Sequence, residues 1–516
     1  MKRISLTIFL ILAFAAPGAW GEDYSRYEKM APDIRDSLEL LRSLDFNGSV
    51  PVVFEKPETA VGAATRIMDL YGPGPGEIDK LQIEWEFLGL IPEGYDLAGA
   101  MRGFYSDRTR AFYDPDNRRV VVAEGIATPG WHTPLILKTM ETLEIEEMEF
   151  ALAHEYSYAL IDSNFPISRL PNLASGPNMS RDSTQAALAL LHGDALLMTM
   201  EYLIRNYGVS ILLLPNPEAI VNQFVSLVTY IDRDSLKSAP APVRNYIKFP
   251  VTKGLAFAVK LRKDGGFPLL DCAYKSLPLS TEQVLHPEKF FEKRDNPVEI
   301  SIPDLSAVIP GGGRLALDDV MGEWGISQLL AGWLEKGDEA ESAAAGWGGD
   351  RFAIYETPGG AKVGAIYTTW DTVEDAQMFE GVFKRAARKA KGGSLAFDIK
   401  TIGMDVTIVI GLAPENARAV MDRLWQSTKS PVVIPPPVPE KPSSEDLMND
   451  MSEFVGIFLK ESTVRPPADD SWHVEGDTFT NSKDHYTLTR PNANWKFQRM
   501  HLGNQFISEL TAINTV

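Results

Sequence analysis

The segment ALAHEYSYALID, residues 151–162, places a His-Glu pair in the middle of a predicted helix. Side chains four positions apart lie on the same face of a helix, so His154 and Tyr158 share a face. Glu155 lies one residue-step round from that face. The stretch therefore predicts a helix that presents an imidazole, a carboxyl group and a phenol close together.

This arrangement is one residue away from the His-Glu-x-x-His helix of zinc peptidases. In such a helix the two His side chains bind zinc, and the Glu activates the metal-bound water as a general base. A third ligand comes from elsewhere, commonly a Glu on a following helix. Tyr158 stands here in the position of the second His. A His-Glu pair on a helix is equally typical of a core histidine with a satisfied hydrogen bond.

The composition is that of a globular protein of two or three domains. The chain has 516 residues, of which 44% are hydrophobic and 23% charged, enough for a large core. A net charge of -20 argues against nucleic-acid binding, because a phosphate backbone would be repelled. Cys272 is the only cysteine, so the chain has no internal disulfide and no Cys-based zinc site. Any metal would depend on His and carboxylate ligands.

The N-terminus has the pattern of a secretory signal peptide. Residues 1–21 read MKRISLTIFLILAFAAPGAWG, with Lys2 and Arg3 before a short apolar run and small residues before Glu22. A membrane anchor is the alternative, but the run is short for a transmembrane helix. Later segments lack an uninterrupted apolar run of that length. We expect an exported protein, secreted or in the periplasm or cell envelope, without a stable membrane span after signal cleavage.

The remaining chain predicts an α+β protein in several parts. Residues 22–295 hold a hairpin in RAFYDPDNRRVVVAEGI and long helices, one with Thr142 as N-cap and one with Ser183 as N-cap. Residues 296–430 alternate strands and helices and predict a small α+β domain. Residues 431–446 are a Pro-rich linker, and residues 447–516 form a short, possibly incomplete C-terminal module.

Several motifs accompany HEYSY in a fixed order. They are AFYDPDNRRVVV before it, HGDA at 192–195, STEQVLHPEKF at 280–290, GWGGD at 346–350, and the Trp370 to Phe379 pattern. Together they resemble an uncharacterised family of exported bacterial and archaeal proteins with a gluzincin-like zinc metallopeptidase domain. The resemblance covers roughly residues 30–430. It implies a mainly helical zincin-like domain with a small sheet.

The resemblance also implies a ligand set, and two of its three positions are changed. The metal ligands fall at His154, Tyr158 and His192, where the family has His, His and Glu, and Glu155 falls at the general base. A phenol, with an ordinary pKa near 10, is a poor ligand at neutral pH, and its oxygen reaches further than an imidazole. His192 is a suitable ligand type, and Gly193 beside it allows a close approach of another helix.

Three functions follow from this set. Without metal, Glu155 has no activated water, which favours a pseudopeptidase that binds a peptide or protein, by strand addition along RRVVVAE. The first alternative is an active zinc peptidase with the atypical ligands His154, Tyr158 and His192. The second alternative is a structural protein of the cell envelope.

Four further residues are candidates for the cleft. Asp162 lies eight residues after His154 on the same helix, so it either orients a ligand or is solvated. Asp194 belongs to the HGDA motif. Glu282 and His286 are spaced to share a helix face. The plainer interpretation of their segment is a helix start, with Ser280 or Thr281 as N-cap and Pro287 disturbing the helix behind it.

Overall fold

The structure, a computed structural model, describes most of the chain before residue 439 and a few strands after it. The described residues are 24–56, 59, 62, 75–106, 111–124, 146–166, 180–205, 210–213, 238–334, 337–438, 472–475, 478–481, 486–489, 495–499 and 510–514. The expected signal peptide, the second half of the expected linker and most of the C-terminal module lie outside this range.

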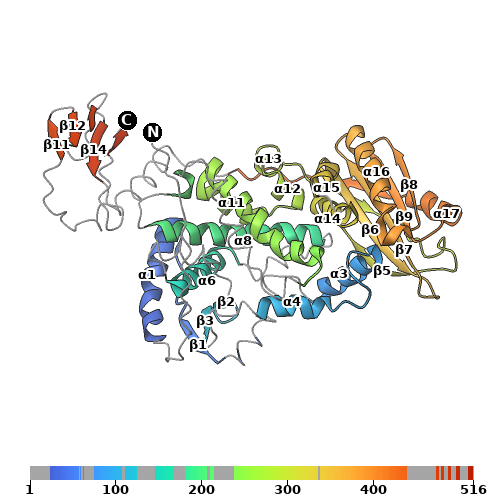
Figure 1. Cartoon of the computed structure of the whole chain (residues 1–516), viewed down its shortest axis with the longest axis horizontal. Helices are drawn as coiled ribbons and strands as arrows, with labels where there is room; N and C mark the ends of the chain where they lie inside the picture. The colour runs from blue at the N-terminus through green and yellow to red at the C-terminus, as the bar shows by residue number, and fades with distance from the viewer. Residues whose placement is uncertain are drawn as a thin grey trace, which may run out of the picture.

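The protein is α+β, as its sequence predicts, with a helical part and a part built on an antiparallel sheet (Figure 1). The helical part holds the helices α1 (Tyr24–Arg42), α6 (Glu147–Asn164), α8 (Arg181–Ile204) and α11 (Ala241–Lys275). Shorter elements surround them: α4 (Leu97–Ser106), η3 (Ile211–Leu213), α12 (Thr281–Leu285) and α13 (Glu288–Phe291).

Helix α8 is the centre of the helical part. It lies between α6 and α11, and nearly all of its side chains are buried. By length and composition it could cross a membrane, but 89% of its most apolar window is buried inside the protein. Burial of that kind is typical of the core helix of a folded domain.

A glycine contact sets the distance between α8 and α11. A Cβ atom at Gly193 would lie 2.0 Å from the Gly254 carbonyl oxygen, and a Cβ at Gly254 would lie 2.1 Å from the Ala189 carbonyl oxygen. Side chains at either position would force the helices apart. The expected close approach at Gly193 is therefore confirmed.

The helix starts differ from the predicted ones. The N-cap of α8 is Ser180, whose hydroxyl accepts the Ser183 N–H while the Ser183 hydroxyl accepts the Ser180 N–H in return. Ser183 is thus the third residue of a capping box, and its prediction as the N-cap was wrong. Helix α6 follows Glu146, which makes no side-chain cap, so Thr142 is not its N-cap either. Thr142 itself lies outside the described residues.

A three-stranded sheet covers one side of the helical core. The predicted hairpin is confirmed as β2 (Ala111–Asp114) and β3 (Arg119–Ala123). The strand β1 (Val52–Glu55) pairs in parallel with β3, which gives the order β1-β3-β2. The segment RRVVVAE is therefore the central strand, and the prediction that a peptide adds along it was wrong, because both of its edges are already bonded.

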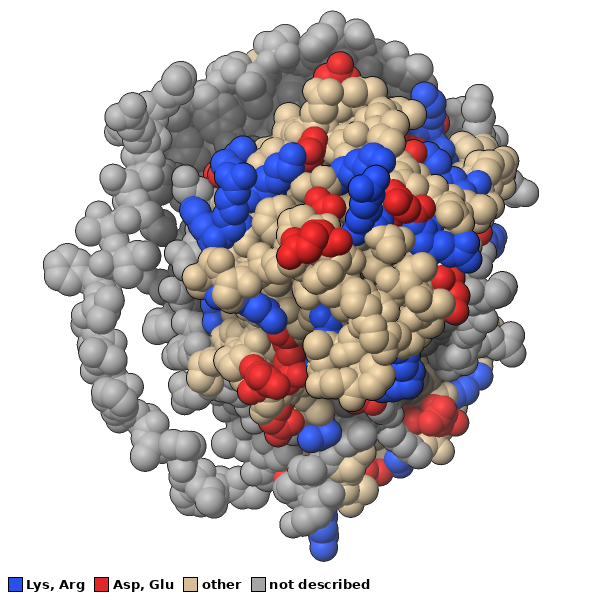
Figure 2. Space-filling model, turned by 90° about the vertical axis from the view of Figure 1, so that its right-hand side faces the viewer, with Lys and Arg blue, Asp and Glu red and all other residues tan. Residues whose placement is uncertain are grey.

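The second part is built on a five-stranded antiparallel sheet in the order β5-β6-β7-β9-β8. Its strands are β5 (Arg314–Asp319), β6 (Trp347–Glu356), β7 (Lys362–Trp370), β8 (Phe397–Ile402) and β9 (Asp405–Ile410). One face packs on α14 (Gly322–Leu334), α15 (Gly337–Ala344) and α16 (Val373–Ala387), and the other on α17 (Pro414–Leu424). Over the end shown in Figure 2, Lys and Arg side chains are interspersed with Asp and Glu.

This second core also takes residues from the start of the chain. Helix α3 (Pro75–Leu88) places Phe87 and Leu88 among the side chains of α14, α16 and the sheet. The indole N–H of Trp333 donates to the Leu88 carbonyl oxygen at 2.9 Å. The two parts are therefore joined through shared burial.

The remaining strands are short. β10 (Thr428–Pro431) pairs antiparallel with β4 (Val298–Ser301), and η4 (Ala390–Gly393) follows α16. Beyond residue 438 the described strands are β11 (Trp472–Glu475), β12 (Thr478–Asn481), β13 (Tyr486–Thr489), β14 (Trp495–Arg499) and β15 (Leu510–Asn514). They pair as β11-β12-β13 and β14-β15.

Candidate functional site

The three expected ligand positions lie together between α6 and α8. The Tyr158 hydroxyl is 2.6 Å from His192 Nδ1, a short hydrogen bond. The Tyr158 ring meets the His154 ring edge-on at 5.0 Å and the His192 ring edge-on at 5.9 Å between centroids. Phe150 stacks on the other side of His154. The phenol thus lies between the two imidazoles and contacts both.

Thr199 fixes the tautomer of His154. The Thr199 hydroxyl donates to the Ala195 carbonyl oxygen at 2.7 Å, so it acts as the acceptor toward His154 Nδ1 at 3.1 Å. Nδ1 of His154 therefore carries the proton, and Nε2 is the basic nitrogen. A metal-binding His needs this form, with a second-sphere acceptor on its other nitrogen.

Glu155 is half-buried and bonded to the neighbouring sheet. Its Oε2 accepts the backbone N–H of Tyr113 in the edge strand β2 at 2.8 Å. Burial raises the pKa of Glu155 to about 8, and the Tyr113 N–H opposes this rise. The Tyr113 hydroxyl donates to Asp162 Oδ2 at 2.9 Å, so Asp162 also holds the strand against α6.

The donor atoms as placed do not fit a zinc ion. Two ligands on a tetrahedral zinc with bonds of about 2.0–2.1 Å lie about 3.3 Å apart. The 2.6 Å between Tyr158 Oη and His192 Nδ1 is too short for this and is the distance of a direct hydrogen bond. One carboxylate oxygen of Glu155 already accepts a hydrogen bond from a backbone N–H. As placed, the group offers hydrogen bonds and aromatic contacts.

Asp194 lies apart from these side chains, although it is two residues from His192. Its Oδ2 pairs with the buried Arg42 of α1 at 3.2 Å, and Arg42 also pairs with Asp271 of α11 at 2.7 Å. The Arg42 guanidinium stacks over the Phe267 ring. Asp194 therefore ties α1, α8 and α11 together.

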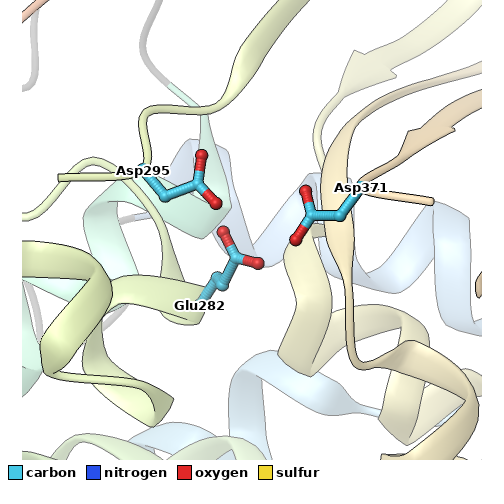
Figure 3. A group of neighbouring side chains, drawn as sticks. All are labelled: Glu282, Asp295 and Asp371. Carbon is cyan, nitrogen blue, oxygen red and sulfur yellow. The ribbon is translucent and has the colours of Figure 1, made fainter. Parts of the chain in front are cut away.

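Glu282 belongs to a second group, where α12 meets the end of β7. Glu282, Asp295 and Asp371 bring carboxylate oxygens within 4.8 Å of one another, a spacing that could hold a metal ion (Figure 3). The Lys289 ammonium already lies among them, at 2.7 Å from Glu282, 2.7 Å from Asp371 and 3.2 Å from Asp295. Lys289 thus supplies the positive charge that this group requires.

His286 is bonded to α14. Its Nε2 lies 2.9 Å from Glu323 Oε1, and this contact, more than any other, raises the pKa of His286. Ser280 is the N-cap of α12, and its hydroxyl accepts the Gln283 N–H. The predicted helix start at Ser280 is confirmed, and the helix ends before Pro287. Glu282 and His286 thus bond in different directions and do not pair with each other.

Four partners that the sequence did not indicate complete these groups: Tyr113, Thr199, Arg42 and Lys289. Thr199 lies seven residues after His192 on α8, so helical spacing from His192 was a usable signal. Tyr113 stands in the AFYDP motif and contributes both its backbone N–H and its hydroxyl. No spacing rule connects Arg42 with Asp194, or Lys289 with Asp371.

Comparison with known families covers the sheet part only. The model of a domain of unknown function, DUF8575, matches residues 313–421. This stretch contains the five-stranded sheet, α14, α15, α16 and most of α17, and it excludes the helices that carry His154 and His192. The comparisons with curated proteins and with solved structures gave no match.

Proposed function

We propose that this chain is an exported, catalytically silent relative of zinc peptidases whose helical part binds an extended peptide or a protein segment. The observation that carries the proposal is the 2.6 Å hydrogen bond between Tyr158 and His192. It joins two expected ligand positions directly to each other. An active zinc site needs both donors aimed at a common metal instead.

The state of Glu155 supports the same proposal. A general base must be able to reach the water it activates. Glu155 is half-buried, its pKa is raised to about 8, and its carboxylate accepts the Tyr113 N–H. A carboxylate engaged in this way holds β2 on α6, and it would have to leave the Tyr113 N–H to present that oxygen to a water.

Within this proposal, the peptide pairs at the Val52 end of the outer edge of β1. In the described part of the sheet, β3 is paired on both sides. On the outer edge of β2, the Tyr113 N–H already donates to Glu155. The Val120 N–H donates to the Pro51 carbonyl oxygen and the Glu124 N–H to the Glu55 carbonyl oxygen. Positions 51, 53 and 55 therefore face β3. The Val52 amide therefore faces away from β3, toward the edge where a further strand would pair.

Metal analysis tests the loss of catalysis. Purified wild-type protein should contain no stoichiometric zinc and should not cleave a quenched fluorescent casein. The double variant Tyr158→His with His192→Glu restores the family's ligand set and should gain zinc. Stoichiometric zinc in the wild type, lost on His154→Ala, would establish the alternative of an active peptidase. The observation that favours this alternative is the proton on His154 Nδ1, which leaves Nε2 able to bind a metal.

A peptide-binding assay tests the binding role. Fluorescence anisotropy with a pool of labelled unstructured decapeptides should detect binding to the wild type. Val52→Pro removes an outward amide and should abolish it, whereas Val52→Ala keeps the amide and should retain it. Equal binding by both variants would place the ligand elsewhere. No binding by the wild type would favour a structural protein of the envelope.

A further inference from the structure

Strand β8 forms an outer edge of the five-stranded sheet. In the described part of the chain its strand partner is β9, and the pairing runs without interruption over all six positions of β8. The opposite edge strand, β5, contacts α3, and a β-bulge between Leu315 and Leu317 interrupts its pairing with β6 (Figure 1). Bulges and covering elements close a sheet edge to further strands. Of the two edges, β8 is therefore the regular one.

The main-chain groups of the odd-numbered residues of β8 point away from β9. The Gly411 N–H donates to the Ala396 carbonyl oxygen, and along an antiparallel strand the residues bonded to one neighbour alternate with residues that face the other side. The Ile399 N–H accordingly donates to its neighbour's side chain, Asp398 Oδ1, at 3.0 Å rather than to β9. The outward-facing residues are Phe397, Ile399 and Thr401.

The order of charges along β8 makes the strand complementary to a second copy of itself. If two copies pair antiparallel with Ile399 opposite Ile399, Asp398 of each copy lies opposite Lys400 of the other. The two neighbouring registers that keep the outward groups paired would place Asp398 opposite Asp398, or Lys400 opposite Lys400. Unlike charges directly opposite each other stabilise strand pairing and like charges oppose it, so the charges select the first register.

The remaining side chains are complementary in the same register. On the face that packs toward α16, Phe397 falls opposite Thr401, an aromatic residue opposite a β-branched one. On the other face, Ile402, which is 54% exposed, falls opposite the exposed Ala396. Apolar side chains that face water in one chain would therefore cover each other in a pair.

We propose that two copies of this chain associate through β8, antiparallel about Ile399, so that their two sheets join into one. In this pair the Ile399 N–H bonds to the Ile399 carbonyl oxygen of the other copy, and Asp398 pairs with Lys400. The Lys400 ammonium lies 5.4 Å from the centre of the Trp425 ring on the exposed side of the strand. Pairing along one strand makes a small interface, so the dimer is weak and depends on concentration. This role is independent of the peptide-binding role proposed for β1, which belongs to another sheet.

Sedimentation of the purified chain over a range of concentrations tests the pairing. The wild type should form a concentration-dependent dimer. Asp398→Lys and Lys400→Asp each place like charges opposite each other twice in one dimer, and each should weaken dimerisation by about tenfold. Arg314→Asp, on the bulged edge strand β5, is the matched control and should leave the dimer unchanged.

Two combinations separate the pairing from a local effect of either substitution. The double variant Asp398→Lys with Lys400→Asp restores unlike charges opposite each other and should dimerise like the wild type. The two single variants, when mixed, should form a heterodimer, since one chain is then basic and the other acidic at both positions. A wild type that stays monomeric, a dimer that the single variants keep or that Arg314→Asp loses, or a mixture without heterodimer would overturn the pairing of β8.

Discussion

Gly193 of α8 faces the carbonyl oxygen of Gly254 in α11, with room for a hydrogen atom and no more. Because a Cβ at position 193 would lie 2.0 Å from that backbone oxygen, Gly193→Ala must push two buried helices apart. We expect a loss of about 2–3 kcal/mol in the free energy of unfolding, measured in urea. Helix propensity alone would predict a gain of about 1 kcal/mol for the same change.

Gly76→Ala serves as the comparison for that variant. Gly76 is exposed in α3, and a Cβ there would meet nothing within 4 Å. It should be neutral or slightly stabilising. If Gly193→Ala were equally harmless, the close contact of α8 and α11 would be disproved.

The buried carboxyl group of Asp182 should make stability depend on pH. Its Oδ1 accepts the N–H of Thr281 at 3.1 Å and also the Thr281 hydroxyl, and burial raises its pKa from 3.8 to about 8. A raised pKa means that the folded form holds a proton which the unfolded form has lost. The contribution is therefore complete below about pH 4 and disappears as the pH rises through 8.

Asp182→Asn should flatten this dependence, since the amide oxygen still accepts from Thr281 and has no proton to lose. Urea unfolding at pH 5 and pH 8 measures the difference. The charged groups facing Asp182 are Asp350, whose pKa burial raises to about 6, and Arg181. A variant with the same pH slope as the wild type would show that Asp182 is ionised in the folded protein.

Replacing Lys289 should turn the acidic group around it into a cation site. Lys289→Met leaves Glu282, Asp295 and Asp371 facing one another without a counter-charge, and should cost about 2 kcal/mol of stability. Millimolar calcium, which prefers carboxylate oxygens, should restore stability in this variant and leave the wild type unchanged. Thermal unfolding with calcium and with chelator measures both effects. Equal responses of the two proteins would mean that the three carboxylates are not gathered.

Removing the hydroxyl of Tyr158 tests its bond to His192. Tyr158→Phe keeps the ring between the imidazoles and loses the 2.6 Å hydrogen bond. The expected cost is about 1 kcal/mol, from the net value of one buried hydrogen bond. Imidazole proton resonances should also shift for His192 and stay in place for His286, which lies in another group. Unchanged stability together with an unchanged His192 signal would exclude the bond.

Local chemistry was sufficient to predict part of this fold. The DPDN turn predicts the hairpin of β2 and β3, and the Ser280 cap predicts the start of α12, because both depend on neighbouring residues. The prediction of Ser183 as the N-cap failed because Ser180 can cap as well, and the tertiary position of α8 decides which of them does. The prediction that a peptide adds along β3 failed because the second partner of β3, strand β1, lies far upstream in the sequence.

In the candidate site, too, contacts between residues close in sequence were predicted and contacts between distant residues were not. Helical spacing brought His154 and Tyr158 together in the prediction, and the structure has them in contact. What the sequence could not give was the direction in which each polar group bonds. Asp194 pairs with Arg42, 152 positions away, and Lys289 pairs with Asp371, 82 positions away. Such pairs depend on the packing of whole elements.

The burial of α3 in the second core has a consequence for how the chain is made. Because a chain is synthesised from its N-terminus, Phe87 and Leu88 emerge long before the sheet that covers them. Trp333, the partner of the Leu88 carbonyl, arrives 245 residues later. The apolar face of α3 therefore stays uncovered until the downstream half of the chain has been made. The maturation of the helical part is completed only by the arrival of the downstream half, so the two parts mature as a single unit.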